Sequence, residues 1–369
     1  MEKVCHITSA HPRYDQRILY RECVSLQDAG YEVTLVVNDV AEDEIFRGVN
    51  IVSTNKSYKG KRFQRMLLGV KNVYNRSKEI DADIYHIHDP ELLRVALKYK
   101  KMGKKVIFDS HEDYVAQIRE KRYLPKFLRN MIANLYYIYE SYVFQRIDGV
   151  VSPAKMDSKN LENRALKIAY VDNRPRLDEL PAKGSFECEE REGLCYAGGL
   201  TYERGILFAA KAASLLKSPL YLAGAFSSEK FEKEILEGEN ADYVHYEGML
   251  GREEVYRLYS RCAIGLCTLL RVGQYAIMPN LPTKVYEYMA MGMPVILSDI
   301  PSIRAIIEKH KFGMLVDPEN PEDIAEKVRY LYENPDEMRA MGKKGKELVY
   351  TEWNWKSEGE KLLDLYKKI

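Results

Sequence analysis

The sequence lacks several features that would each assign it to a class at once. No run of about 18 apolar residues occurs in the chain, which argues against a transmembrane helix. Residues 1–20 contain no apolar segment of the kind that directs secretion, so we expect no export signal. The six cysteines form no CxxC pair and show no zinc-ligand spacing. We therefore expect reduced thiols and a cytoplasmic protein.

Two common nucleotide-binding signatures are also missing. No GxGxxG follows the first predicted strand, so the usual NAD fingerprint is absent. No GxxxxGK followed by Ser or Thr occurs either, which argues against a P-loop nucleotide hydrolase.

The composition is that of a folded protein with two unlike halves. Apolar residues make up 46% and charged residues 30% of 369 residues, which suits two globular domains of ordinary size. The net charge of +1 hides an asymmetry, because residues 1–170 carry 29 Lys and Arg against 22 Asp and Glu, whereas residues 171–369 carry 27 against 33. A basic half can meet nucleic acid, an anionic membrane or an anionic substrate.

Short β-branched runs alternate with helical stretches, which predicts doubly wound parallel sheets. The alternation is interrupted at 172–190. This stretch contains prolines, glycine and mixed charges, which predict a linker between domains. We therefore predict an α/β protein with one domain at 1–175 and a second at 190–352, with ligands bound at the carboxyl ends of strands. The strands are expected at 4–8, 32–37, 49–53, 84–87, 105–108 and 149–152, and then at 193–197, 220–223, 244–247, 263–267, 294–297 and 313–316.

The most informative segment begins at Asn280. Pro282 suits the start of a helix, and the free amides of that first turn form an anion site together with the helix dipole. Lys284 and Glu287 are three residues apart and share one helix face. A cation beside those amides suits a diphosphate, and a carboxylate one turn further on can accept both hydroxyls of a ribose. The alternative is an ordinary surface pair of Lys and Glu.

A second phosphate signal lies at Gly198 and Gly199, directly after a predicted strand. A glycine pair alone is usually only a turn. Here Arg204 follows, so backbone amides and a guanidinium can converge on phosphate oxygens.

These segments resemble those of glycosyltransferase family 4, whose members retain anomeric configuration and have the GT-B fold. Segment 280–296 resembles the C-terminal signature of that family, and further stretches resemble it in order: 15–22, 30–33, 86–92, 196–200 with 204–205, and the closing 355–366. The resemblance implies two Rossmann-like domains facing a central cleft. It implies an acceptor-binding domain at 1–175, a nucleotide-sugar domain at 190–352 and a C-terminal helix at 354–369 that crosses back to the first domain.

The resemblance also implies roles for particular residues. His88, Arg204 and Lys284 are expected to act in catalysis, with the ring and backbone of His88 beside the donor sugar. The donor is expected to contact Gly198, Gly199, Arg204, Asn280, Leu281, Pro282, Thr283, Lys284 and Glu287. Two positions depart from the family pattern, because Pro279 stands where a second glutamate is common and Gly199 stands where arginine is common.

The histidines of the first half raise the question of a metal. His86 and His88 share a strand face, but no further ligand lies at suitable spacing except His111, so a hydrogen bond from a strand-end histidine to a sugar is favoured over a metal. His111 can face the same site or have a plain structural role. Asp81 and Asp83 spell DxD at the start of a strand, where a polar turn explains them.

Two stretches, 56–78 and 119–129, interleave basic with large apolar residues. Lys121, Arg122, Lys126 and Arg129 are the cations of the second stretch. Such a pattern suits a helix on an anionic lipid surface, or an amphipathic helix packed on its own domain. Nucleic acid is not expected as a partner, because no recognition motif accompanies the charge.

Together these features predict a retaining hexosyltransferase. It transfers a sugar from a nucleotide-diphosphate donor, expected to be UDP-linked, to a hydroxyl of a lipid-linked or cell-surface saccharide. We expect neither a cofactor nor a metal. We do expect peripheral contact with the inner face of a membrane. The alternatives are a nucleotide-sugar epimerase, with His88, His111 and Glu112 as acid–base groups, and a sugar-binding protein without catalysis.

Overall fold

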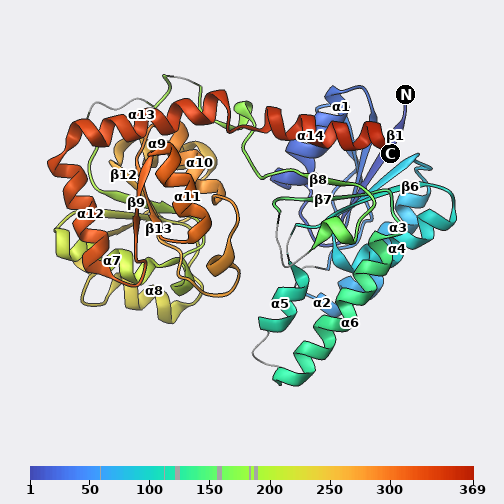
Figure 1. The fold of residues 1–369 in the computed structure, drawn as a ribbon, viewed down its shortest axis with the longest axis horizontal. Coiled ribbons are helices and arrows are strands. Elements are labelled where there is room, and N and C mark those ends of the chain that lie inside the picture. The colour runs from blue at the N-terminus through green and yellow to red at the C-terminus, as the bar shows by residue number, and fades with distance from the viewer. Residues whose placement is uncertain (59, 112, 121–124, 156–159, 183, 187–189) are drawn as a thin grey trace. The chain divides into compact units, whose positions relative to one another are not determined.

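The structure is a computed structural model that describes all residues except 59, 112, 121–124, 156–159, 183 and 187–189. Glu112, Lys121 and Arg122 therefore lie outside the described residues. The chain forms two compact units, and Figure 1 shows the elements of each. The first unit comprises residues 1–173 and 355–369, and the second comprises residues 174–354.

The first unit is built on an eight-stranded sheet in the order β3-β4-β2-β1-β5-β6-β7-β8. All neighbouring strands are parallel except β3, which runs antiparallel to β4. The strands are β1 (Lys3–Ile7), β2 (Glu32–Val37), β3 (Glu44–Phe46), β4 (Val49–Ser53), β5 (Ile84–Ile87), β6 (Lys105–Asp109), β7 (Gly149–Ser152) and β8 (Ile168–Tyr170).

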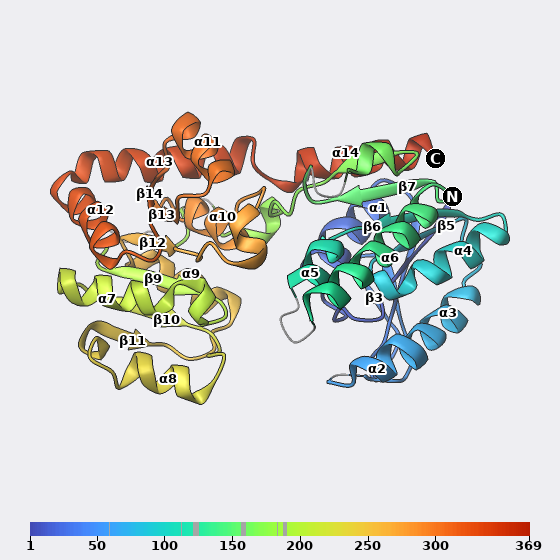
Figure 2. The same cartoon turned by 60° about the horizontal axis from the view of Figure 1, so that its bottom comes forward.

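Helices connect these strands and cover the sheet. Asp15 begins the first of them, because its carboxylate accepts from the backbone amides of Arg17 and Ile18, both at 2.9 Å. Helices α4 and α6 pack against each other, as Figure 2 shows. The helical segments are η1 (Gln16–Cys23, π-helical), α1 (Val24–Asp28), α2 (Arg62–Gln64), η2 (Arg65–Gly69, π-helical), α3 (Val70–Lys78), α4 (Leu93–Lys101), α5 (Tyr114–Glu120) and α6 (Lys126–Phe144).

The last helix, α14 (Trp355–Lys368), packs on the first unit. Its apolar face buries Leu362 and Leu365 against the sheet core. The indole Nε1 of Trp355 donates to Ser25 Oγ at 2.7 Å. The carboxylate of Glu358 accepts from the backbone amide of Asp172 at 2.8 Å. These contacts attach the end of the chain to the domain in which it begins.

The second unit has a six-stranded sheet in the order β11-β10-β9-β12-β13-β14, and all its neighbouring strands are parallel. The strands are β9 (Leu194–Ala197), β10 (Leu220–Ala223), β11 (Val244–Tyr246), β12 (Ile264–Cys267), β13 (Val295–Ser298) and β14 (Gly313–Val316). The helices are α7 (Ile206–Leu216), α8 (Glu229–Leu236), α9 (Arg252–Arg261), α10 (Thr283–Ala290), α11 (Pro301–His310), α12 (Pro321–Glu333) and α13 (Pro335–Thr351).

All twelve strands predicted from the sequence are present. The two strands that the prediction missed, β3 and β8, have three residues each and lie at the edges of the first sheet. Runs this short carry little periodicity to distinguish them from a loop, although β11, which is equally short, was predicted. The antiparallel β3 is also the one exception to the predicted parallel pairing.

Strand order reverses once in each sheet, and this positions the loops of interest. In the first sheet the reversal lies between β1 and β5, and in the second between β9 and β12. Loops that leave such neighbouring strands diverge to opposite sides and open a crevice at their carboxyl ends. Each unit therefore has a ligand-binding edge of its own.

Candidate functional site

The loop after β9 brings bare backbone close to two cations. Gly198 has a φ of 141°, a conformation that L side chains rarely adopt. A Cβ at this position would lie 3.0 Å from Nζ of Lys284 and 3.3 Å from Nη1 of Arg204. At Gly199 it would lie 3.4 Å from the same Nη1. The glycine pair thus lets both cations approach the backbone more closely than a side chain at these positions would allow.

Arg204 is positioned by a tight turn. It ends the short helical segment η6 (Tyr202–Arg204), and Gly205 follows with a φ of 74°. A Cβ on Gly205 would lie only 2.0 Å from the carbonyl oxygen of Thr268, so this approach of the loops after β9 and β12 requires glycine. The Arg204 guanidinium donates to the hydroxyl of Tyr196 at 3.3 Å. The turn therefore holds the guanidinium over the glycine loop.

Lys284 lies in the first turn of α10 and is the most unusual group of the second unit. Its Nζ is buried and has no hydrogen-bond partner among the residues that the structure describes. It lies 3.2 Å from the centroid of the Tyr196 ring, which gives it a cation–π contact. Burial, with a further contribution from Arg204, lowers the pKa of Lys284 to about 7. An anion bound beside it would restore the charged form.

The remaining donor-site residues of the sequence prediction surround this lysine. Pro282 precedes the first residue of α10, with φ −59° and ψ 145°, so it stands just before the helix rather than inside its first turn. Leu281 is buried, Asn280 is half-buried and Thr283 is exposed. The predicted residues Gly198, Gly199, Arg204 and Lys284 meet in space, whereas Glu287 lies one turn further along α10.

Glu287 is half-buried and accepts a hydrogen bond from the hydroxyl of Tyr259 at 3.3 Å. Its charge raises the pKa of Tyr259, although burial of that phenol contributes more. The tyrosine fixes the carboxylate on the face of α10 that also carries Lys284. This edge of the second sheet can bind a diphosphate at its cations and a hydroxyl pair at its carboxylate.

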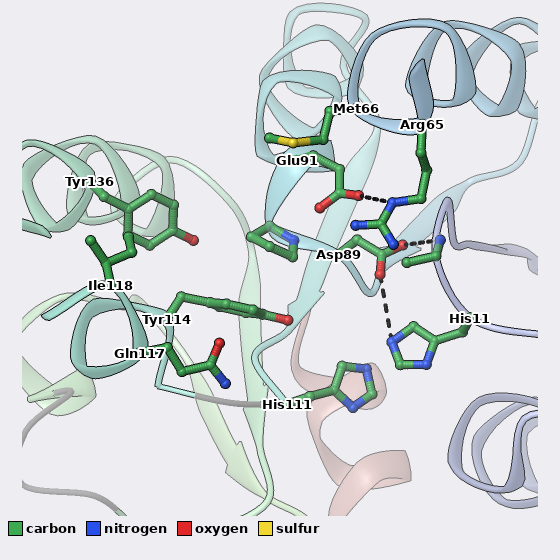
Figure 3. A pocket seen from close by; sticks show the side chains of 12 residues that line it. His11, Arg65, Met66, Asp89, Glu91, His111, Tyr114, Gln117, Ile118 and Tyr136 are labelled. Carbon is green, nitrogen blue, oxygen red and sulfur yellow. Dashed lines mark hydrogen bonds and ion pairs between the residues drawn. The ribbon is translucent and has the colours of Figure 1, made fainter. Parts of the chain in front are cut away.

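The first unit has a pocket of about 500 Å³ at its own strand ends. Figure 3 shows carboxylates and imidazoles at one side of it and aromatic rings at the other. Its polar and aromatic lining consists of His11, Arg65, Asp89, Glu91, His111, Tyr114, Gln117 and Tyr136. The pocket is therefore lined from the loops after β1, β5 and β6 and from η2, α5 and α6.

Hydrogen bonds fix the carboxylates of this pocket. Asp89 Oδ2 accepts from the hydroxyl of Thr8 at 2.8 Å and from the backbone amide of Ser9 at 2.6 Å. Glu91 pairs with Arg65 at 3.1 Å. Although burial opposes it, the carboxylates of Asp15 and Asp89 raise the pKa of His11. The pocket thus combines fixed acceptors with an imidazole that gains a proton readily.

His88 does not line this pocket. Its ring is fully buried, with Nε2 at 2.9 Å from Nδ1 of His6 and Nδ1 at 3.3 Å from Nε2 of His111. Both ring nitrogens are engaged inside the domain, so this structure does not support the expected contact of the His88 ring with a donor sugar. His111 lines the pocket instead, and burial lowers its pKa to about 3, which keeps it neutral.

Below these histidines lies a buried set of charges. Arg17 forms a paired contact with Asp109, with nitrogen–oxygen distances of 2.7 and 3.1 Å, and its Nε lies 3.0 Å from Glu22. Although burial opposes it, Arg17 holds the pKa of Asp109 well below its usual value. Burial and the charge of Asp109 raise the pKa of Glu22 well above its usual value. This group joins η1 to the carboxyl end of β6.

Two groups of described residues have ligand atoms close enough for a metal ion. One consists of His6, Glu22, His86 and His88, and the other of His88, Asp109 and His111. The DxD residues have other roles: Asp81 pairs with Lys104, and Asp83 accepts from the amide of Lys3. The DxD motif is thus a polar turn. That the activity needs no metal ion stays a prediction.

Sequence reasoning missed several residues of the first pocket. His11 was not singled out, although it follows the first strand by four residues, a position at a carboxyl strand end that could have drawn attention to it. Tyr114 and Tyr136 reach the pocket from α5 and α6, and no local signal marks them for it. Arg65 belongs to the basic stretch 56–78 singled out above, but for a lipid surface or for packing and not for this pocket.

Among the described helices, none is both long and apolar enough to cross a membrane.

Comparisons with known proteins agree with this architecture. Residues 16–171 match the family model "Glycosyltransferase Family 4", and residues 182–348 match "Glycosyl transferases group 1". Spore coat protein SA of Bacillus subtilis is 27% identical over 128 residues, covering 34% of this chain and 32% of that protein. A GDP-mannose-dependent alpha-(1-6)-phosphatidylinositol monomannoside mannosyltransferase of Mycobacterium tuberculosis is 25% identical over 127 residues, covering 34% and 33%. The matched segment thus spans about a third of the length of these curated relatives.

Solved structures match over the whole chain. Sucrose-phosphate synthase from Thermosynechococcus elongatus has a TM-score of 0.78 at 16% identity and is covered to 99%. HepE of Anabaena, solved in complex with UDP, has a TM-score of 0.71 at 11% identity and is covered to 100%. Both alignments cover 100% of this chain. The two family models and these folds together show that the chain belongs to glycosyltransferase family 4 and has the two-domain GT-B fold of that enzyme class.

Proposed function

We propose that the protein transfers a sugar from a UDP-linked donor to a hydroxyl of a saccharide, with retention of the anomeric configuration. The observation that carries this proposal is the buried, unpartnered Nζ of Lys284 beside Arg204 at the glycine loop. A diphosphate supplies the negative charge that these two cations lack. The complex of UDP with the structurally similar HepE supports the choice of nucleotide.

In the proposed reaction, the bond between the anomeric carbon and the donor phosphate breaks, and charge grows on the departing diphosphate. Arg204 and Lys284 stabilise that charge, together with the amides of the glycine loop and of the first turn of α10. The acceptor hydroxyl forms its bond on the face that the diphosphate leaves, and its proton passes to the diphosphate. Because two cations neutralise the leaving group, we propose that the transfer needs neither a divalent metal nor a cofactor.

The pocket of the first unit is the proposed acceptor site. Asp89 and Glu91 can accept hydrogen bonds from saccharide hydroxyls, and Tyr114 offers an aromatic face to a sugar ring. The mycobacterial relative acts, by its name, on a lipid-linked mannoside, which supports a lipid-linked or cell-surface saccharide as the acceptor class. We place the reaction in the cytoplasm, and the cysteines Cys5, Cys23, Cys195, Cys262 and Cys267 are unpaired, which suits a reducing compartment.

Calorimetry with UDP tests the donor site. Arg204→Ala removes a charged contact to phosphate, and Glu287→Ala removes the acceptor for the ribose hydroxyls. Each change is expected to weaken UDP binding about 10- to 100-fold without unfolding the protein. GDP, the nucleotide of the mycobacterial relative's donor, is the competing ligand and is expected to bind more weakly.

The matched control is Arg257→Ala, an exposed arginine that pairs with Glu253 one helical turn away. It should leave UDP affinity unchanged. Equal UDP affinity in the wild type and both site variants would rule out this donor site. Full loss of transfer in excess EDTA, restored by Mg²⁺ or Mn²⁺, would rule out the metal-independent reaction.

A further inference from the structure

Helix α6 carries a stripe of exposed apolar side chains along its whole length. Phe127, Leu135 and Ile138 are 73%, 60% and 65% exposed, and the stripe is completed by Met131, Tyr139 and Tyr142. Each of these positions lies three or four residues from another of them, so they share one helix face. A water-soluble helix normally turns such a face inward, and exposed apolar surface of this extent marks an interaction site.

A second set of exposed apolar side chains lies on the neighbouring segments α2 and η2. Phe63 is 84% exposed, and Met66, Leu67 and Leu68 are exposed as well. Met66, from this second set, lines the pocket of the first unit, and so does Tyr136, which lies on α6 outside the apolar stripe (Figure 3). Arg94 of α4 interacts with a member of each set. Its Nη2 donates to the carbonyl of Met66 at 2.7 Å. Burial raises the pKa of Tyr139, and the charge of Arg94 opposes that rise.

The charged groups of α6 that reach solvent have one sign. None of the acidic residues of α6 is exposed, since Glu140 is buried against Arg164 at 2.5 Å. Lys126 and Arg129 stand at the beginning of the helix, and Arg146 follows its end with its guanidinium 3.5 Å from the ring centroid of Tyr142. Cations at both ends, aromatic rings near one end and apolar groups between them complement an anionic lipid surface.

We propose that the exposed apolar residues of α2, η2 and α6 form a lipid-docking face that rests on an anionic bilayer. The face attaches reversibly, with the apolar side chains in the headgroup region and the basic residues against lipid phosphates. The pocket of the first unit lies beside this face, because η2 and α6 each contribute to its lining. As far as it concerns the acceptor, this inference rests on the proposed function: the saccharide that enters the pocket is carried on a lipid.

Co-sedimentation with vesicles tests the lipid-docking face. The wild-type protein should bind phosphatidylglycerol vesicles at low salt, bind phosphatidylcholine vesicles far less, and dissociate in 0.5 M NaCl, about the ionic strength that screens contacts beyond a few ångströms. Met131→Gln, Leu135→Gln and Ile138→Gln together should weaken vesicle binding at least about tenfold. Lys126→Ser with Arg129→Ser should weaken it about tenfold through charge alone.

The control carries equally exposed changes in the second unit, Leu215→Gln and Met249→Gln, at side chains that are 51% and 74% exposed. It should bind vesicles as the wild type does. UDP affinity should be unchanged in every variant, so a failure of UDP binding counts against the proposed function and not against the docking face. A wild type that ignores phosphatidylglycerol at low salt overturns the docking face. Vesicle binding of the triple variant at the wild-type level also overturns it. The same holds if the triple variant differs from the wild type only in the loss of a dimer, measured by light scattering.

Discussion

The two units differ in how the buried charged groups at their strand ends are paired. In the first unit, the buried guanidinium of Arg17 contacts Asp109 and Glu22, and its Nη1 donates to the carbonyl of Val171 at 2.9 Å. In the second unit, the buried ammonium of Lys284 has no hydrogen-bond partner among the described residues and lies against the face of Tyr196. The first unit pairs its buried guanidinium with a carboxylate of the fold, whereas the buried ammonium of the second unit has no carboxylate hydrogen-bonded to it among the described residues.

The difference indicates which of the two edges has a structural role and which can bind a ligand. A buried charge with internal partners holds strands in place and gains little from a ligand. A buried charge without a partner costs stability in the free protein and regains it when an anion binds. We therefore interpret the Arg17 group as architecture and the Lys284 group as a binding site. Variants of each unit test this contrast.

The largest expected effect is in the first unit. Arg17→Leu leaves the carboxylate of Asp109 buried without its cation, and should lower the free energy of unfolding by about 3–5 kcal/mol. Thermal unfolding followed by circular dichroism measures the loss, which should appear in the transition of the first unit if the two units unfold separately.

Arg76→Leu is the matched control for this change. Arg76 also contacts two carboxylates, Glu79 and Asp43, but all three groups are exposed to solvent. Its loss should cost less than about 1 kcal/mol. An equal, small effect of both substitutions would show that the Arg17 group does not stabilise the fold.

The second unit is expected to respond in the opposite direction. Lys284→Met keeps a chain of similar length over the Tyr196 ring and removes a buried charge. At pH 6.5 the ligand-free variant should be more stable than the wild type by about 2 kcal/mol, while its affinity for UDP should fall about tenfold or more. Thermal unfolding and calorimetry measure the two changes on the same samples.

The pH dependence gives this prediction a sign. The pKa of Lys284 is about 7 in the folded protein and near the ordinary value for lysine in the unfolded chain. The unfolded state therefore binds more protons between these two values, so the penalty is full below pH 7 and disappears as the pH rises towards about 10.5. The gain in stability of Lys284→Met should accordingly shrink between pH 6.5 and pH 9. A gain that is absent at pH 6.5, or that grows with pH, would contradict the unpaired charge.

The contrast between the units also explains what could be predicted from the sequence. The donor edge depends on short segments, because Gly198 to Arg204 and Asn280 to Glu287 each lie within one loop and one helix start. Their residue types and spacing therefore carry the signal. The strands were predictable for the same reason, since periodicity within five or six residues decides them.

The first unit depends on contacts that no local pattern contains. Nδ1 of His86 lies 2.8 Å from the hydroxyl of Tyr366, 280 residues later in the chain. His88 stood at a strand end next to Asp89, and nothing in its neighbourhood in the sequence indicated that His6 and His111 would enclose it. The position of the strand end was predicted correctly, whereas the contact of the His88 ring with a donor sugar stays a prediction, and both ring nitrogens already have partners in the domain.

The smallest expected effect concerns that same distant contact. The hydroxyl of Tyr366 on α14 lies between Nδ1 of His86 at 2.8 Å and Nε2 of His6 at 3.4 Å, and all three side chains are buried. Tyr366→Phe keeps the ring in the core and removes only this hydroxyl, which should lower the free energy of unfolding by about 1 kcal/mol. Tyr14→Phe is the control, because its hydroxyl contacts Glu44 at the exposed surface and should matter less. UDP affinity should stay at the wild-type value in both variants, since Tyr366 belongs to the unit that completes its contacts within the fold. A loss of UDP affinity in Tyr366→Phe alone would mean that the buried histidines also act on the donor site, and the division between an architectural edge and a binding edge would fail.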